Sequence, residues 1–393
     1  MSPRTSGRPG RRLFIAIPAV AVPVAIAAVI LVPMQAVGAV DLPDKTPQEL
    51  LAFVQSEHVD QLSGTLEQTS DLGIPDLSAL LGGSGSSEAP TSEATTTTTT
   101  TEDLLALATG SYSARVYLDQ DRARLQVLDD LAERNIYVDA DAATGWFVDS
   151  ESQTATRVSL PDRAALEKPA PPADAGSELP TPEAMLERAL ADLDESTDVT
   201  VGTDGRVAGR DAYELVLTPR SDSTLVGSVR FAIDGENGTA LAASVTARGA
   251  DQPAFQVAFT DVSFAAPDPA DLSFTPSAQL TVTEKEITLP TAVQVERWRA
   301  DAEAEGGTAD AAAPTVIGDD WSTVIEVGAP ADGSALDRLS AEQRQLVDTV
   351  TTPVTGGRAF ETALLTVLIT DDGRILAGAV PVERLVDAAG SGR

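Results

Sequence analysis

The chain has 393 residues, a formal net charge of −33 at pH 7 and aromatic side chains at only 4% of its positions. A chain of this length is long enough for two domains, and any core or cavity would be built mostly from Leu, Val, Ile and Ala. The excess of acidic residues would repel phosphate backbones, which argues against nucleic acid as a partner. The chain has no cysteine and a single histidine, which excludes disulfides, thiol nucleophiles and sites built from several Cys or His ligands.

Residues 1–40 predict a signal peptide or a membrane anchor. Four arginines lie within residues 1–12, and residues 13–40 carry no charge. Small residues at 37–39 favour cleavage, whereas the length of the apolar run favours a retained anchor, and both alternatives stay open. In either case the arginines remain on the cytoplasmic side, and the body of the protein is secreted or held at the outer face of the cell membrane.

A helix and a series of strands are predicted next. Thr46-Pro47-Gln48-Glu49 is a capping box with Pro at the first helical position, and His58 would be a polar edge residue of the helix that follows. Residues 81–102 are rich in Gly, Ser and Thr and predict a disordered insertion. Strands are predicted at 61–70, 111–118, 122–128, 133–138, 144–149 and 154–160.

The second half of the body repeats this order. A Pro/Ala-rich linker at 161–180 leads to a second amphipathic helix that begins at Thr181-Pro182-Glu183. Strands follow at 206–219, 225–233, 240–247 and 254–264, and the Asp204-Gly205 turn and a second tight turn or bulge at 209–211 accompany the first of them. We therefore predict an α+β fold: one large curved antiparallel β-sheet, a half-barrel, with two helices in its concavity.

Residues 206–219, RVAGRDAYELVLTP, and residues 141–150, DAATGWFVDS, carry a distinctive order of turn and strand residues. The first segment resembles the second half of the LolA/LolB-like lipoprotein carriers, in particular their actinobacterial members. The second resembles a Trp-containing strand of the same family, with Val148 where the family usually has Tyr. The resemblance covers residues 41–284 and extends to RseB-like envelope proteins, so it implies the fold more closely than the ligand.

The remainder predicts a linker at 285–314 and a small C-terminal α+β unit at 315–393. In this unit we expect a strand at 321–327, a helix at 336–350, a hairpin of strands 362–370 and 374–380, and a terminal helix at 381–389. Asp371-Asp372-Gly373 would form the hairpin turn.

No pattern in the sequence predicts catalysis. There is no phosphate-binding glycine loop and no nucleophile elbow. Neighbouring pairs of acidic residues occur, but among 60 Asp and Glu residues such pairs are expected by chance. The oxygen-rich segment 234–238 lacks the ligand spacing of an EF-hand. We expect a protein that is not an enzyme, with no cofactor and no metal site.

Five aromatic residues are candidates for lining an apolar ligand cavity: Trp146, Tyr213, Phe231, Phe255 and Phe259. Alternation places Tyr213 with Leu215 and Leu217 on one face of their strand, but it does not say which face is concave. The alternative is that the same residues form a sealed core. The family resemblance favours a cavity.

Three functions follow as hypotheses. The first is a monomeric, non-enzymatic carrier that binds lipid or the acyl chains of a lipid-modified protein. The second is an RseB-like envelope sensor or interaction module that acts through a membrane protein partner. The third is a structural envelope protein whose core is sealed and which binds no ligand.

Overall fold

The computed structural model describes residues 40, 42–56, 59–73, 110–128, 133–159, 181–191, 193–286, 315–318, 320–328 and 347–391. Residues 1–39 of the predicted export segment, the insertion, the linker at 161–180, most of the linker at 285–314 and His58 lie outside these residues. No helix among the described residues is both long enough and apolar enough to cross a membrane.

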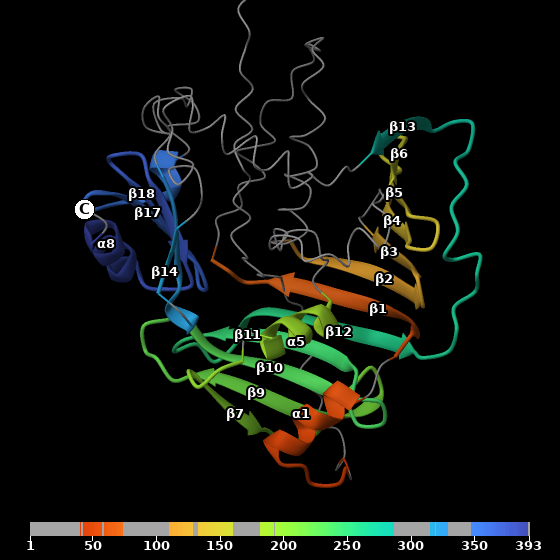
Figure 1. Ribbon diagram of the computed structural model, residues 1–393, viewed down its shortest axis with the longest axis horizontal. Coiled ribbons are helices and arrows are strands. Elements are labelled where there is room, and N and C mark those ends of the chain that lie inside the picture. Colours follow the sequence, from red (N-terminus) through yellow and green to blue (C-terminus); the bar gives the residue numbers. More distant parts are fainter. Residues whose placement is uncertain are drawn as a thin grey trace, which may run out of the picture.

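One sheet of 13 strands dominates the structure (Figure 1). Its first half contains β1 Gln61–Ser70, β2 Tyr112–Asp119, β3 Arg122–Leu128, β4 Glu133–Asp139, β5 Thr144–Asp149 and β6 Thr154–Ser159. Its second half contains β7 Thr197–Val201, β8 Gly205–Val207, β9 Arg210–Pro219, β10 Val226–Asp234, β11 Ala240–Ala247 and β12 Pro253–Ser263, and β13 Thr281–Glu286 is added at the far edge. The order is β13-β6-β5-β4-β3-β2-β1-β12-β11-β10-β9-β7, with β8 paired to β9, so antiparallel pairing of β1 with β12 joins the halves.

Two helices of ten residues each, α1 Pro47–Ser56 and α5 Pro182–Ala191, pack on the same face of this sheet (Figure 1). Thr46 and Glu49 form the predicted capping box, with the Thr46 backbone N–H donating to Glu49 Oε2 at 2.8 Å. Thr181 caps α5 by accepting the Ala184 backbone N–H at 3.2 Å. The predicted curved antiparallel sheet with two helices is confirmed.

The face that packs against α1 and α5, here called the concave face, carries the main apolar core. Tyr213, Leu215 and Leu217 of β9 lie opposite Ile233, Phe231 and Val229 of β10. All six are buried in one cluster with Leu50 of α1 and Leu186 of α5. The alternation in the sequence therefore grouped these side chains correctly, and the helices identify the face on which they lie.

The interruption at the start of β9 is the predicted second tight turn. Ala208 and Gly209 have φ angles of 50° and 78° and connect β8 to β9. Two successive positive φ angles define a type I′ hairpin turn, which matches the twist of the strands that it joins.

The C-terminal unit is a six-stranded sheet in the order β14-β15-β19-β18-β17-β16, covered on one face by a helix. Its elements are β14 Thr315–Ile317, η2 Asp320–Ser322, β15 Val324–Val327, β16 Thr352–Val354, β17 Gly357–Glu361, β18 Thr366–Thr370, β19 Ile375–Gly378 and α8 Val382–Ser391. The predicted hairpin and terminal helix are present. Of the helix predicted at 336–350, only residues 347–350 lie in the described part of the chain, and these are helical.

Two strand boundaries in this unit were predicted wrongly. Trp321 lies in a 3₁₀ turn instead of a strand, because Asp320 has a φ of 59° and its carboxylate accepts the Ser322 N–H. Residues 362–365 form a loop instead of the start of β18, because the Thr362 hydroxyl accepts the backbone N–H groups of Leu364 and Leu365. Such side-chain bonds compete with the strand ladder. Strands β14, β16 and β17 were not predicted.

The connection from β12 to β13 crosses the opposite, convex face of the first half-sheet. Phe274 stacks on Tyr137 at 5.3 Å and meets Trp146 edge-on at 5.2 Å between ring centroids. Strand β13 then pairs with β6 in parallel, an arrangement that the sequence did not predict.

A buried ion pair fixes the turn between β10 and β11. The Asp234 side chain is fully buried and accepts hydrogen bonds from the Arg210 guanidinium and from the backbone N–H groups of Glu236 and Asn237. The hydrogen bond to Asp234 is the main cause that raises the pKa of Arg210 above its usual value. One carboxylate therefore connects this turn to β9.

Replacing Asp234 by Asn should lower the free energy of unfolding by about 2–3 kcal/mol, because it leaves the partly buried Arg210 guanidinium with only the exposed Glu236 carboxylate as counter-charge. The amide oxygen can still accept the turn N–H groups, so the charge is the main loss. The matched control is Asp211→Asn, which breaks an exposed pair with Arg206 and should cost below about 1 kcal/mol. Urea unfolding measures both, and equal losses would contradict the assignment.

Candidate functional site

A cavity of about 470 Å³ opens on the concave face between strands β2–β4 and the first turns of α5. Besides Pro182, eleven of the residues that line it are apolar, and these come from the sheet, from α5 and from the segment before β1. They are Val59, Leu62, Val116, Leu118, Ala123, Leu125, Ile136, Val138, Ala184, Ala240 and Phe259. We call this space the first cavity.

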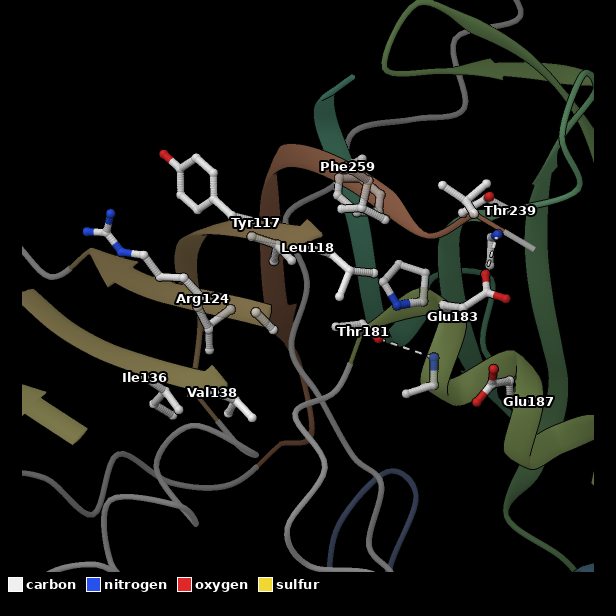
Figure 2. Close-up of a pocket in the computed structure, with 18 residues that line it drawn as sticks. Tyr117, Leu118, Arg124, Ile136, Val138, Thr181, Glu183, Glu187, Thr239 and Phe259 are labelled. Atoms are coloured by element: carbon white, nitrogen blue, oxygen red, sulfur yellow. Dashed lines mark hydrogen bonds between the residues drawn. The ribbon is translucent and has the colours of Figure 1, made fainter. Parts of the chain in front are cut away.

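The first cavity has two unlike walls (Figure 2). Leu118, Ile136 and Val138 form an apolar wall on the strands, and Thr181, Glu183 and Glu187 form a polar wall on α5. The Glu183 carboxylate accepts the Ala240 backbone N–H at 2.8 Å, which ties the start of α5 to the start of β11.

Two residues at the margin of the first cavity direct their polar groups elsewhere. Figure 2 shows the side chains of Tyr117 and Arg124 pointing away from Glu183 and Thr239. The Arg124 guanidinium donates to Asn135 Oδ1 at 2.8 Å and to the Asp271 carbonyl at 3.2 Å, and it lies 5.0 Å from the Tyr137 ring centroid. Arg124 therefore holds the β12–β13 connection on the convex face.

A second cavity of about 610 Å³ lies on the other side of α5, where the half-barrel meets the C-terminal unit. Met185 and Ala189 of α5, Phe231 of β10, and Trp321 and Leu364 of the C-terminal unit are among the residues that line it. We call it the junction cavity.

Hydrogen bonds across this junction connect the two units directly. Trp321 Nε1 donates to Thr197 Oγ1 at 2.8 Å, and the Leu225 backbone N–H donates to the Ala379 carbonyl at 2.8 Å. The C-terminal unit is therefore docked on the half-barrel, and Leu364 is buried in the main core.

The five aromatic residues predicted as ligand contacts are separated by the structure. Phe259 lines the first cavity and Phe231 lines the junction cavity. Tyr213 and Phe255 are buried in the concave core, 2% and 0% exposed, away from the described lining of either cavity. Trp146 lies on the convex face and contacts Phe274. Side chains alternate between the two faces along β5, so the residues on either side of Trp146 face the concave side instead.

Sequence reasoning missed the polar wall and the junction. Glu183 and Glu187 were taken only as parts of an amphipathic helix, and Trp321 as a strand residue. The apolar positions of β2–β4 gave a usable indication, since Val116, Leu125 and Ile136 alternate with polar neighbours. No sequence pattern brings these strands to face α5, because that contact joins distant parts of the chain.

The first cavity offers apolar surface that is partly shielded from solvent. Within the described ranges, no group of three or more His, Cys, Asp or Glu residues is placed to hold a metal ion. The first cavity combines one long apolar wall with a few polar groups at one end, which is the usual composition of a pocket for an amphipathic small molecule.

No protein-family model and no curated protein matches the sequence. Solved structures similar in fold include MucB in the MucA/MucB complex of Pseudomonas aeruginosa, with 15% identity over 87% of this chain and 96% of that chain and a TM-score of 0.40. A LolA superfamily protein from Nitrosomonas europaea has 10% identity over 59% of this chain and 99% of that chain, with a TM-score of 0.22. A conserved protein from Thermus thermophilus has 11% identity over 61% of this chain and 98% of that chain, with a TM-score of 0.31.

The chain has the half-barrel arrangement of sheet and helices that was predicted from its sequence. The ligand has to be argued from the chain's own residues, because one fold serves many functions.

The pH dependence of the free energy of unfolding tests the burial of Tyr112 at the start of β2. Burial raises the pKa of Tyr112 to about 12, whereas an unfolded tyrosine titrates near 10. Between these values the unfolded chain loses a proton that the folded chain keeps, so the free energy of unfolding should fall as pH rises from 10 towards 12. In Tyr112→Phe this fall should be shallower, by at most roughly 2–3 kcal/mol over the interval.

Urea unfolding at pH 9, 10 and 11 measures the difference, and absorbance of tyrosinate follows the titration directly. An unchanged slope and an unchanged late titration step in Tyr112→Phe would contradict the burial of this phenol.

Proposed function

We propose that this chain is a non-enzymatic cell-envelope protein that binds an acyl chain, of a lipid or of a lipid-modified protein, in the first cavity. The observation that carries the proposal is the apolar wall of β2–β4 facing α5 across about 470 Å³. Phe259 contributes to the same cavity, and Phe231 contributes to the neighbouring one.

The energetics favour an acyl ligand. Each buried methylene contributes about 0.8 kcal/mol, so a single long chain supplies useful affinity even after the cost of ordering it. The cavity volume lies in the range of small-molecule sites, roughly 300–1,000 Å³.

We place the protein outside the cytoplasm. The arginines in residues 1–12 followed by an uncharged apolar run support this location. Mass spectrometry of organic extracts of the chain purified from an envelope fraction tests the proposal. A lipid present in stoichiometric amount supports it and names the ligand class, whereas an empty protein that takes up no acyl probe rejects it.

Val138→Asp should weaken binding of an uncharged fluorescent acyl probe at least about tenfold, because a carboxylate placed against the chain loses its hydration. Val138 is 36% exposed and lines the first cavity, so the fold should tolerate the change. Fluorescence titration gives the affinity, and thermal unfolding reports on the fold.

Val282→Asp is the matched control for this variant. Val282 is 45% exposed on β13 and lies away from the described lining of both cavities. Its replacement should leave probe affinity within about twofold, a difference below about 0.5 kcal/mol. Equal loss in the two variants would show that the probe binds elsewhere.

The junction cavity favours a second candidate function, that of a sensor which passes ligand occupancy to a membrane protein partner. A ligand in this cavity would contact the half-barrel and the C-terminal unit together, since both units line it. Any preference of the ligand for one arrangement of the units would shift their equilibrium.

Hydrogen exchange separates the carrier from the sensor. With an uncharged acyl probe, a sensor should show slower exchange in β7 and in residues 320–327, whereas a carrier should show it only in β2–β4 and α5. Trp321→Phe removes the hydrogen bond to Thr197, worth about 1 kcal/mol, and should speed exchange at β7 without ligand. Protection that never reaches residues 320–327 would reject the sensor.

A further inference from the structure

We infer that the first cavity selects amphiphiles whose head group is neutral or cationic and discriminates against carboxylate and phosphate head groups. The inference rests on the proposed function and adds to it the chemical class of the ligand. It follows from how charge is distributed around the cavity.

The two walls fix the direction in which an amphiphile lies. The tail has favourable contacts only along the apolar wall that includes Leu118, Ile136 and Val138 (Figure 2). The head group then lies at the opposite wall, beside Thr181, Glu183 and Glu187 at the start of α5. The charge of that wall therefore decides which head groups are accepted.

No cation among the described lining residues can compensate an anionic head group. Arg124 is the one basic residue among them, and its guanidinium is engaged on the convex face by Asn135 and the Asp271 carbonyl. Its side chain is only 14% exposed. It is therefore not available to a ligand in the cavity.

The start of α5 does not supply a compensating positive field. A helix N-terminus carries roughly half a positive charge, which would attract an anion. Here Thr181 already accepts the Ala184 N–H, and the two glutamates add two negative charges to the same wall. Glu183 is already engaged by the Ala240 N–H, so the exposed Glu187 supplies the charge that a head group meets, and its full negative charge exceeds the roughly half positive charge of the helix terminus.

The glutamates are held at the wall in different ways. The hydrogen bond from Ala240 fixes the Glu183 carboxylate, whereas Glu187 is exposed one helical turn further along. A unit charge about 4 Å from another in water is worth about 1 kcal/mol, or about fivefold in affinity. We therefore expect each carboxylate that lies near the head group to weaken the binding of an anionic ligand about fivefold relative to a neutral one.

The experiment compares three probes with the same acyl chain on the full protein: hexadecanoate, monohexadecanoylglycerol and hexadecanoylcholine. Calorimetry or competition against the fluorescent acyl probe gives the affinities, below the concentration at which the probes aggregate. We expect hexadecanoate to bind at least about fivefold more weakly than the neutral ester, and the choline ester to bind at least as tightly.

Charge-neutral variants identify the source of the discrimination. Glu187→Gln should narrow the gap between hexadecanoate and the neutral ester, and adding Glu183→Gln should narrow it further while the amide oxygen can still accept the Ala240 N–H. The control is Asp371→Asn, which makes the same change in net charge in the β18–β19 turn of the C-terminal unit. It should leave the gap unchanged.

The outcomes separate this inference from the proposed function. If no probe binds, both are rejected. If all three bind and hexadecanoate binds as tightly as the neutral ester, the head-group selection is wrong and the proposed function stands. A gap that is unaffected by Glu187→Gln, or equally affected by Asp371→Asn, would attribute the discrimination to the overall charge of the chain and overturn the inference.

Discussion

The rest of the structure depends on one constraint: the two helices are too short to cover the whole concave face of the sheet. A ten-residue strand such as β9 is about 33 Å long, whereas a ten-residue helix such as α1 or α5 is about 15 Å long. Among the described residues, these two short helices are the helical cover of a sheet of 13 strands. The cavities lie on the two sides of α5, where its cover ends.

The continuous concave face itself depends on the pairing of β1 with β12. Gly64 sits at this join, where an added Cβ would lie 2.5 Å from the Asp261 carbonyl oxygen and 2.8 Å from the Phe259 ring. The absence of a side chain at this position allows the two halves to approach and gives Phe259 its place in the first cavity. The same residue therefore joins the sheet and shapes the site.

Much of the fold could be predicted from the sequence because its determinants are local. The capping box at Thr46, the turn at Ala208-Gly209 and the alternation of Tyr213, Leu215 and Leu217 all depend on neighbouring residues. Trp146 shows where such reasoning ends: alternation assigns residues to two faces, but only contacts with distant segments decide which face is concave. The parallel addition of β13 to β6 is non-local in the same way.

The candidate site was predicted in part for the same reason. Phe231 and Phe259 were identified because large aromatic residues in strands are visible in the sequence. The polar wall was not, since Glu183 and Glu187 resemble ordinary surface residues of an amphipathic helix. They line a site only because α5 faces β2–β4 across a cavity. That arrangement depends on several strand pairings between distant parts of the sequence.

The junction decides how the carrier and sensor functions relate. Four described hydrogen bonds cross it or support it: Trp321 to Thr197, Leu225 and Thr224 to the Ala379 carbonyl, and Ala363 to the Leu72 carbonyl. At about 0.5–1.5 kcal/mol each, they amount to roughly 2–6 kcal/mol.

An acyl chain that buries about eight methylenes supplies about 6 kcal/mol, which is of the same size. Ligand energy is therefore sufficient to change the docking of the units only if most of it is gained in one arrangement and not in the other. A ligand confined to the first cavity can favour one arrangement of the units only through α5. This helix is the wall that the two cavities share. The contacts of α5 with its two cavities thus determine whether the half-barrel only binds its ligand or also transmits the binding to the C-terminal unit.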